Sequence, residues 1–333
     1  MHAKFSKSGF LAVGFLAACL LAGAVPVAAA AAGGEGDRPV PPNHGFLFDK
    51  DAYAIPSSQV ETFGSQTVSK LSLRLYGGYN HMLAGDVNEG SDYYFELVEA
   101  YIAEGSGTAT GGYKPLHGGY AFGADLVYQL TPSFGIGIGA GFVRSSAKSL
   151  GTFADEETVD LLAETNLSAV PIRLGLFLDF PLSGKLALTA NAGAAYYLGL
   201  KFTGMQGVEF SATEWMRMSL EASERSGADI GFHGGLGLEY KLSPKLGLFV
   251  EGVGRYAKLK NFETVTGTQE YSDGSSDTTA GKLYLLIGNT KGFEISMFEI
   301  SETEPTPDPG TTVREPKFDL SGFSLQAGIR IRL

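Results

Sequence analysis

Charged side chains recur inside segments that are otherwise apolar, and they are the first candidates for chemistry. Each falls on the face opposite a row of apolar side chains, because alternate residues of a strand point to opposite faces. The candidates for an enclosed ion network are Arg74, Asp125, Glu239, Glu251, Arg255 and Arg330, with Arg173, Asp179, Lys201, Lys241 and Arg332 on the same faces. Enclosed charges need partners. We predict that Glu251 pairs with Arg330. Arg74 is predicted to pair with Asp125 or Glu251, and an ion pathway is the alternative to a structural network.

Histidines are the other candidates. His81 and His117 lie near the ends of two alternating segments and could approach each other, whereas His233 is on an enclosed face. Their spacing matches neither a set of metal ligands nor a Ser-His-Asp triad, which is recognised by its geometry. We therefore predict a protein that is not an enzyme and has no catalytic, cofactor-binding or metal-binding residues.

Residues 1–32 have the organisation of a secretory signal peptide. Lys4 and Lys7 precede an apolar stretch at 10–25, and small residues follow at 27–32. Two alternatives stay open. One is a retained membrane anchor, and the other is a lipoprotein signal in which Leu16-Ala-Ala-Cys19 forms the lipobox.

Residues 33–68 contain several prolines and no periodicity, which predicts an irregular periplasmic leader, with a plug or partner-binding segment as the alternative. The single cysteine, Cys19, lies in the predicted signal, so no disulfide or cysteine metal site is expected after cleavage. The formal charge of −11 becomes −13 when Lys4 and Lys7 leave with the signal. Such an acidic chain argues against nucleic acid as a partner.

Eight segments with two-residue alternation follow. They are residues 71–80, 118–130, 134–142, 170–180, 186–201, 230–241, 246–256 and 323–333. The connections between them alternate between long polar stretches and short turns, the long ones being 84–115, 148–166, 203–229 and 260–318. Outer-membrane barrels have an even number of strands, short periplasmic turns and long extracellular loops.

For residues 69–333 we therefore predict an all-β fold, an eight-stranded antiparallel up-and-down transmembrane β-barrel with long extracellular loops. A ten-stranded barrel and a soluble periplasmic β-sandwich are the alternatives. Helical spacing predicts short helices near 92–102, 155–163 and 213–224. Two apolar runs flank Gly288-Asn289 and predict a hairpin that extends the last strands beyond the membrane. Apolar residues in the long stretches are predicted to cap the barrel, and binding of a partner is the alternative.

The alternating strands, with Leu248-Phe-Val-Glu-Gly-Val-Gly-Arg-Tyr256 as the penultimate one and 323–333 as the last, also support a comparison with a known group. The chain resembles the small eight-stranded outer-membrane barrels of Gram-negative bacteria, the opacity-protein and OmpA/OmpX-like group. The resemblance covers 71–333 and rests on pattern rather than on a unique motif. It implies a monomer in the outer membrane with a structural or surface role and with outer loops that are available to bind an unidentified ligand or partner.

The same resemblance implies outer-membrane lipid, lipopolysaccharide and the barrel-assembly machinery as partners. A porin-like role or transport of small hydrophobic molecules is the first functional alternative. A few small barrels that resemble this chain act on lipid A through His, Ser and acidic groups at the outer rim. A lipid A-modifying enzyme is therefore a further alternative.

Overall fold

A computed structural model describes residues 70–103, 107–155, 157–211, 213–225, 230–260, 262–290 and 292–333. The chain divides into two compact units, residues 1–69 and residues 70–333. The predicted signal peptide (1–32) and leader (33–68) lie outside the described residues and stay predictions. Within the described ranges, no helix combines the length and the apolar character needed to cross a membrane.

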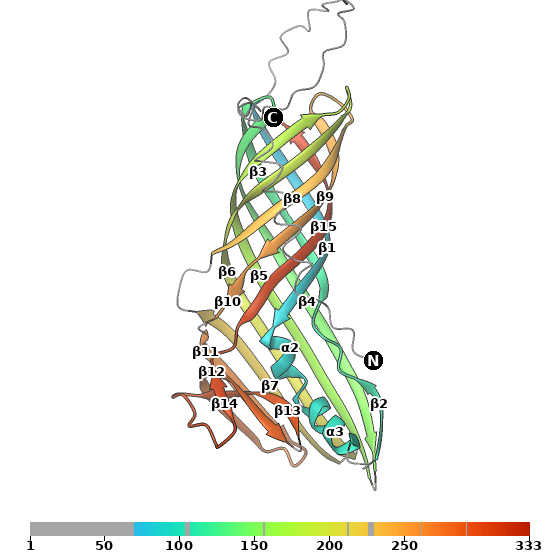
Figure 1. Ribbon diagram of the computed structural model, residues 1–333, viewed down its shortest axis with the longest axis vertical. Coiled ribbons are helices and arrows are strands. Elements are labelled where there is room, and N and C mark those ends of the chain that lie inside the picture. Colours follow the sequence, from blue (N-terminus) through green and yellow to red (C-terminus); the bar gives the residue numbers. More distant parts are fainter. Residues whose placement is uncertain are drawn as a thin grey trace, which may run out of the picture. The chain divides into compact units, whose positions relative to one another are not determined.

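Eight antiparallel strands form a closed ring. They are β1 (Leu71–Gly85), β3 (Gly118–Thr131), β4 (Phe134–Ala154), β5 (Thr158–Pro181), β6 (Leu186–Ser211), β8 (Ile230–Lys241), β9 (Leu246–Tyr256) and β15 (Phe318–Arg332). Consecutive ring strands pair with each other, and β15 pairs with both β9 and β1, which closes the ring (Figure 1). The predicted ring of eight antiparallel strands is confirmed. The ten-stranded and sandwich alternatives are not what the described residues form.

The two ends of the ring differ. Three short connections, 132–133, 182–185 and 242–245, lie at one end, which we call the turn end. Lys70 and Leu333 are at this end too, since Lys70 accepts a backbone hydrogen bond from Gln129 and Leu333 donates one to Leu71. All longer connections leave from the opposite end, which we call the cap end.

Two stretches predicted as polar loops, 148–166 and 203–229, are largely strand. β4 and β5 continue past the ring as one hairpin, and β6 continues to pair with β7 (Glu214–Arg225). The prediction of helices at 155–163 and 213–224 was therefore wrong. Their helical spacing involved only three residues each, whereas strand pairing gives the backbone groups in these stretches hydrogen-bonding partners along their length.

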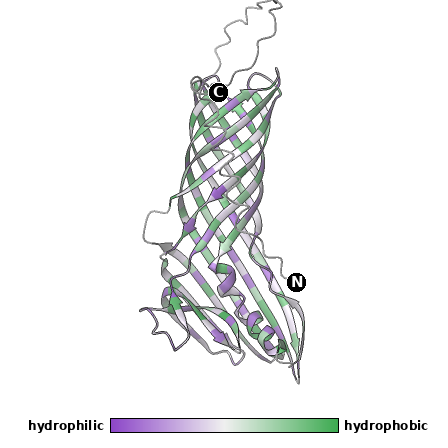
Figure 2. Cartoon of the chain, in the orientation of Figure 1, coloured by the Kyte–Doolittle hydropathy of each residue, from purple (hydrophilic) through white to green (hydrophobic). Residues whose placement is uncertain are grey.

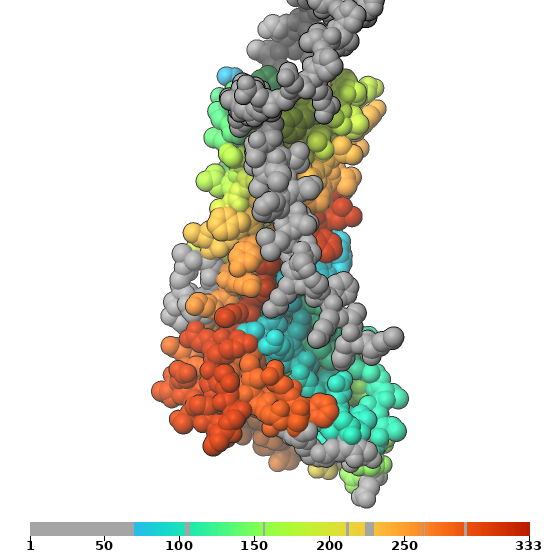
Figure 3. All heavy atoms as spheres, in the orientation of Figure 1, coloured from blue at the N-terminus to red at the C-terminus, as the bar shows by residue number. Residues whose placement is uncertain are grey.

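The rest of the cap end is a small sheet with two helices, which we call the cap. β11 (Phe262–Tyr271) pairs with β7 and with β12 (Ser276–Thr290), which in turn pairs with β13 (Phe293–Ser301). The remaining cap elements are α2 (Asp86–Ser91), α3 (Tyr93–Ala103), β2 (Thr108–Gly112), β10 (Lys258–Leu259) and β14 (Thr312–Arg314). Figure 3 shows β12–β14 beside α2 and α3, and the Ser296 amide donates to the Glu96 carboxylate at 3.0 Å.

The helix predicted near 92–102 corresponds to α3. The predicted hairpin is present as β12–β13, but with two differences. Thr290 faces Phe293 across the turn, so Gly288-Asn289 lies inside β12. The hairpin also continues the sheet of β7 and β11 instead of extending the last ring strands.

An apolar core joins the cap to the ring. The Phe318 ring of β15 lies 4.9 Å from Phe202 of β6 and 4.4 Å from Phe262 of β11, and Phe298 of β13 is 5.7 Å from Phe202. These four side chains are at most 6% exposed. With Met82, Leu116, Leu167, Leu259, Leu283, Leu285 and Leu320 they form the cap core. Apolar residues from the long connections thus cover the cap end of the ring.

Gly199 is where β6 changes its surroundings. The β5–β6 register shifts between Ser168 and Val170, and Gly199 has φ +54°, a backbone conformation in which L side chains are rarely found. This bulge inserts one extra residue and reverses which face each later side chain occupies. Lys201, which was predicted on the enclosed face, is therefore exposed, and Phe202 is enclosed instead.

Candidate functional site

The outer surface of the ring is apolar. Leu174 is 66% exposed and Ile138 is 56% exposed. Similar exposure recurs at Phe122, Leu126, Leu176, Phe232, Leu238, Leu248, Val250 and Leu325, so that all parts of the ring contribute. Figure 2 shows apolar residues recurring along the ring strands. An exposed apolar surface of this extent marks contact with a partner or a membrane.

Aromatic side chains border this surface at both ends. Toward the cap end lie Tyr79, Tyr120, Tyr196, Tyr256 and Phe323, and toward the turn end lie Tyr128, Phe180 and Tyr240, each more than 40% exposed. Between these borders the outward positions carry Leu, Ile, Val, Phe, Ala and Gly. We call this uncharged band the apolar belt. Tyr128 comes eight positions after Tyr120, which is about 20 Å along the axis at ~3.3 Å per residue and ~40° of tilt.

The inside of the ring holds two ion clusters. Arg74, Asp125, Glu239, Glu251 and Arg330 are each at most 5% exposed. In the mid-ring cluster, Arg74 forms ion pairs with Glu251 and, at 3.8 Å, with Asp125. Arg173 joins this cluster through Asp125 at 2.5 Å. All four residues come from different strands, so the cluster ties one side of the ring to the other.

Neutral groups complete the mid-ring cluster. Asn191 donates to Glu251 at 2.6 Å, and Arg173 donates to the Tyr76 hydroxyl. The Arg74 guanidinium lies 4.3 Å from the centre of the Phe249 ring, within reach of a cation–π interaction. A buried charge is tolerated when it is both paired and hydrogen-bonded, and these contacts meet that requirement.

The turn-end cluster contains Asp179, Glu239, Arg330 and Arg332. Arg330 lies 2.8 Å from Asp179 and 3.0 Å from Glu239, and Arg332 also pairs with Glu239. Gln129 donates to Asp179 at 2.9 Å. This cluster crosses the inside of the ring close to its short turns.

The predicted pair of Glu251 with Arg330 was wrong. In the β9–β15 register Glu251 is opposite Gln326, whereas Arg330 is opposite Gly247, four residues nearer the turn end. Arg74 and Arg330 face each other across β1 and β15, and two like charges in that position repel. Their side chains go to different carboxylates, with Arg74 in the mid-ring cluster and Arg330 in the turn-end cluster.

Arg255 was also predicted in the ion network, and it makes a different set of contacts near the cap end. Its partners among the described residues are neutral: Asn80 at 2.7 Å, the Leu320 carbonyl at 2.6 Å and Ser324 at 3.4 Å. Asn80 also bonds to Ser145 and Ser324, which links four strands. On the cap-end side of this polar layer, the apolar cap core begins.

Little space is left between these layers. Two cavities of about 30 and 10 Å³ lie beside Arg173 and His233, and Tyr76 also lines the larger one. The larger has room for a water molecule or two. Ion pairs, a polar layer around Arg255 and the cap core therefore fill the ring in succession from the turn end.

Of the three histidines singled out in the sequence, His81 and His117 lie close together and His233 does not join them. The His81 and His117 rings lie 5.1 Å apart, and His81 also stacks on Phe323 at 5.0 Å. His117 Nδ1 donates to the Met82 carbonyl at 2.9 Å. His233 is separate, inside the ring. Among the described residues, no three His, Cys, Asp or Glu side chains are grouped so that they could hold a metal ion.

The predicted network of six residues left out several members of the clusters. Arg173 and Asp179 had been assigned to the enclosed faces but not to the network, and Tyr76 and Asn191 are uncharged. The alternation of the strands was the signal that placed all four inside. Their pairing depends on the stagger between neighbouring strands, which alternation does not contain.

The cap carries acidic groups around its helices. Asp86 binds Arg314 and accepts from the Lys317 amide at 2.7 Å. Burial and the neighbouring Glu96 carboxylate raise the pKa of Asp92 from 3.8 to about 8. Burial also raises the pKa of Glu96 and of Glu89. The cap near α3 therefore holds carboxyl groups that keep their protons more strongly than carboxyls in water do.

No family model matches the chain, and no curated protein matches it by sequence. Among solved structures it is similar to a major outer membrane protein from Thermus thermophilus, with a TM-score of 0.35 and 13% identity over 79% of this chain and 99% of that chain. It is also similar to the outer membrane protease OmpT from Escherichia coli, with a TM-score of 0.30 and 10% identity over 80% of this chain and 98% of that chain. The ring itself is defined by its own strand pairing.

Proposed function

We propose that this protein is a non-enzymatic outer-membrane β-barrel of a Gram-negative bacterium, which spans the membrane with its ring and carries the cap outside the cell. The observation that carries the proposal is the apolar belt around a closed ring, bordered by aromatic side chains at both ends. A closed barrel satisfies all backbone groups within the sheet, which a membrane requires. In water, the same belt would leave a large apolar surface exposed.

The orientation follows from the connections. Barrels of the outer membrane keep short turns in the periplasm and long connections outside. The turn end, with Lys70 and Leu333, is thus periplasmic, and the cap is extracellular. Outer-membrane lipid and lipopolysaccharide surround the belt, the barrel-assembly machinery inserts the chain, and the barrel acts as a monomer.

The role that fits the interior best is structural display of the cap. Two cavities beside the mid-ring cluster have volumes of about 30 and 10 Å³, and the two ion clusters, the Arg255 layer and the cap core occupy the ring around them. This arrangement does not favour a porin-like role or passage of a hydrophobic molecule through the ring. The surface that remains for binding a partner is the outside of the cap and of the strands that lead to it.

Fractionation tests the location. The mature protein is expected in the carbonate-resistant outer-membrane fraction, and its migration on SDS gels is expected to change on heating because the closed barrel resists SDS until it is boiled. Protease added to intact cells should cut the cap around Pro305 and leave the ring. Free solubility without detergent would contradict the proposal.

Planar-bilayer recording tests the closed interior. The purified barrel is expected to show no steady single-channel current. A variant that opens the turn-end cluster, Arg330→Ala with Glu239→Ala, provides the comparison. Steady conductance of the unmodified barrel would favour the porin-like alternative.

A further inference from the structure

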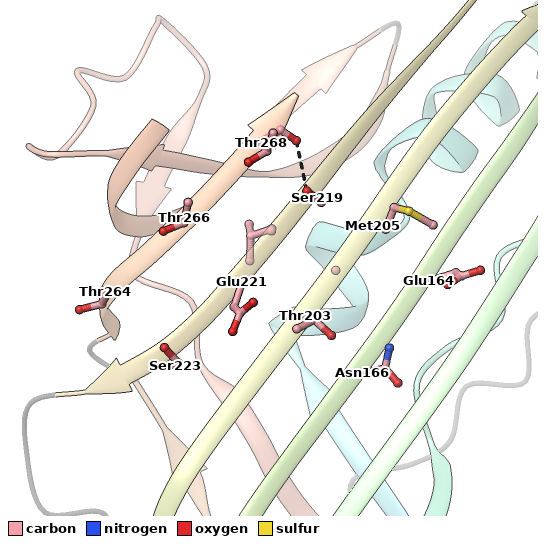
Figure 4. A pocket seen from close by; sticks show the side chains of 12 residues that line it. Glu164, Asn166, Thr203, Met205, Ser219, Glu221, Ser223, Thr264, Thr266 and Thr268 are labelled. Atoms are coloured by element: carbon pink, nitrogen blue, oxygen red, sulfur yellow. Dashed lines mark hydrogen bonds between the residues drawn. The ribbon is translucent and has the colours of Figure 1, made fainter. Parts of the chain in front are cut away.

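A polar groove lies on the outward face of the four strands that lead from the ring to the cap. Its volume is about 560 Å³, and β5, β6, β7 and β11 form its floor. Figure 4 shows the side chains that line it. Eight of the twelve lining residues form two cross-strand rows, Asn166–Thr203–Glu221–Thr266 and Glu164–Met205–Ser219–Thr268.

The chemistry of the groove is that of a surface for hydroxyl-rich ligands. Its rows offer hydroxyls, an amide and two carboxylates, and Met205 adds an apolar surface among them. Each carboxylate has a cationic neighbour, Lys148 at 2.5 Å from Glu164 and Lys201 at 2.6 Å from Glu221. The groove therefore presents donors and acceptors together, with no net charge from these two pairs. Sugar hydroxyls, which both donate and accept, match such a surface.

The groove lies next to the apolar belt, and this position indicates where its ligand comes from. On β6 the outward residues Tyr196 and Leu198 belong to the belt side, and Lys201 and Thr203 follow directly after the Gly199 bulge. Tyr196 faces Ile230 of β8, which is 61% exposed, at the point where β7 replaces β8 beside β6. An apolar wall therefore continues into the polar groove.

We propose that the groove binds the saccharide head group of an outer-leaflet glycolipid, with the acyl chains of that lipid lying on the wall at Tyr196, Leu198, Ile230 and Phe232. The inference rests on the proposed function, because only a membrane at the belt brings a lipid to this height. Thr203 and Thr266 hydrogen-bond to sugar hydroxyls from the floor of the groove. Lys148 and Lys201 at its margin make charge-assisted hydrogen bonds to acidic substituents of the sugar.

The test is equilibrium binding to the purified full-length barrel in detergent micelles. Three probes are titrated: rough-type lipopolysaccharide, its core oligosaccharide freed from lipid A by mild acid, and phosphatidylglycerol. The double variant Thr203→Val with Thr266→Val removes two hydroxyls at nearly constant shape. The matched control is Thr108→Val with Thr110→Val, two exposed threonines on β2.

Lipopolysaccharide is expected to bind the unmodified barrel more tightly than either other probe does, because it alone engages both the groove and the wall. The groove variant is expected to bind it about tenfold more weakly, since two hydrogen bonds are lost. The control is expected to stay within about twofold. Equal affinity of the groove variant and the unmodified barrel would overturn the inference.

The other outcomes separate the two proposals. Equal binding of the freed oligosaccharide would make the ligand a soluble glycan, and equal binding of phosphatidylglycerol would remove the role of the sugar; either overturns the glycolipid assignment. Failure to bind lipopolysaccharide by a barrel that is heat-modifiable and present in the outer membrane overturns the inference alone. Absence of the protein from the membrane fraction overturns the proposed function first.

Discussion

β6 passes through two environments, and its two halves are built in opposite ways. Before Gly199 its outward side chains include Leu188, Tyr196 and Leu198, and it faces the inside of the ring with Asn191, which bonds to Glu251. After Gly199 the outward residues are Lys201 and Thr203, and Phe202 is enclosed in the cap core. One strand thus has apolar residues outside in its first half and inside in its second.

Under the proposed function, the difference follows from the solvent that each half meets. Where water surrounds a sheet, burial of apolar area drives the large side chains inward. Where lipid surrounds it, apolar side chains gain nothing from moving inward, and the interior is filled by ions and hydrogen bonds that lipid could not satisfy. At the bulge around Gly199 the pairing of β6 is locally interrupted, and the strand continues beyond it with its two faces exchanged.

The largest expected effect comes from breaking the mid-ring cluster. Glu251→Gln leaves Arg74 enclosed with Asp125 at 3.8 Å as its remaining ion-pair partner. Loss of one member of a buried pair costs about 3–5 kcal/mol. The measurement is the free energy of unfolding from urea titration in lipid vesicles.

The matched control for that substitution is Glu221→Gln in the cap-side strands, where the pair with Lys201 is about half exposed on both sides. An exposed pair contributes about 0–1 kcal/mol. Similar losses at the two positions would show that the ring interior is as wet as the outer surface of the cap-side strands.

The next effect tests the outer surface. Leu174→Arg places a charge in the apolar belt, which is expected to destabilise the inserted barrel by about 2–4 kcal/mol. Leu150→Arg changes a leucine of comparable exposure, 59% against 66%, on the part of β4 beyond the belt. The heat-modifiable fraction of each variant in the outer membrane measures the difference, and equal fractions would place the belt in water.

The smallest effect concerns the pH dependence of the cap. The pKa of Asp92 is about 8 when folded against 3.8 as its ordinary value. Between these values the folded state holds a proton that the unfolded state has lost, so stability falls as pH rises from about 4 to 8 and is level above that. Asp92→Asn is expected to remove that loss, about 1–2 kcal/mol at pH 8 after solvent screening.

Hydrogen-exchange protection of the α3 amides at pH 5, 7 and 9 follows this change. The decrease of this protection with rising pH is expected to be smaller in the Asp92→Asn variant than in the unmodified protein. Some decrease should remain, because burial also raises the pKa of Glu89 and Glu96. The ring strands should show no matching change. The same pH dependence of protection in the variant and in the unmodified protein would mean that Asp92 is ionised in the folded cap.

Alternation and connection length together predicted the ring. Alternation was informative because a strand of a membrane barrel has one apolar and one polar face along its whole length. They failed beyond the ring for a reason visible in β5. Leu161, Ala163 and Leu167 also alternate there, but the outward residues between them include Glu164 and Asn166, so the stretch has the composition of a loop. The three-residue helical matches at 155–163 and 213–224 were then the strongest remaining signal, and strand pairing on both sides overrode it, with the adjacent hairpin strand on one side and a further strand on the other.

For the site, the sequence by itself determined that Arg74, Asp125, Glu239, Glu251 and Arg330 lie on the faces opposite the apolar side chains, and the barrel predicted from the connection lengths placed those faces inside. Only the tertiary structure decided which of them pair. The stagger between strands sets the height of each charge, and the facing of Arg74 and Arg330 sends them to separate carboxylates. The groove at Thr203 and Thr266 was decided in the same way, because it exists only where three consecutive strands, β5, β6 and β7, and the later strand β11 bring their polar faces together.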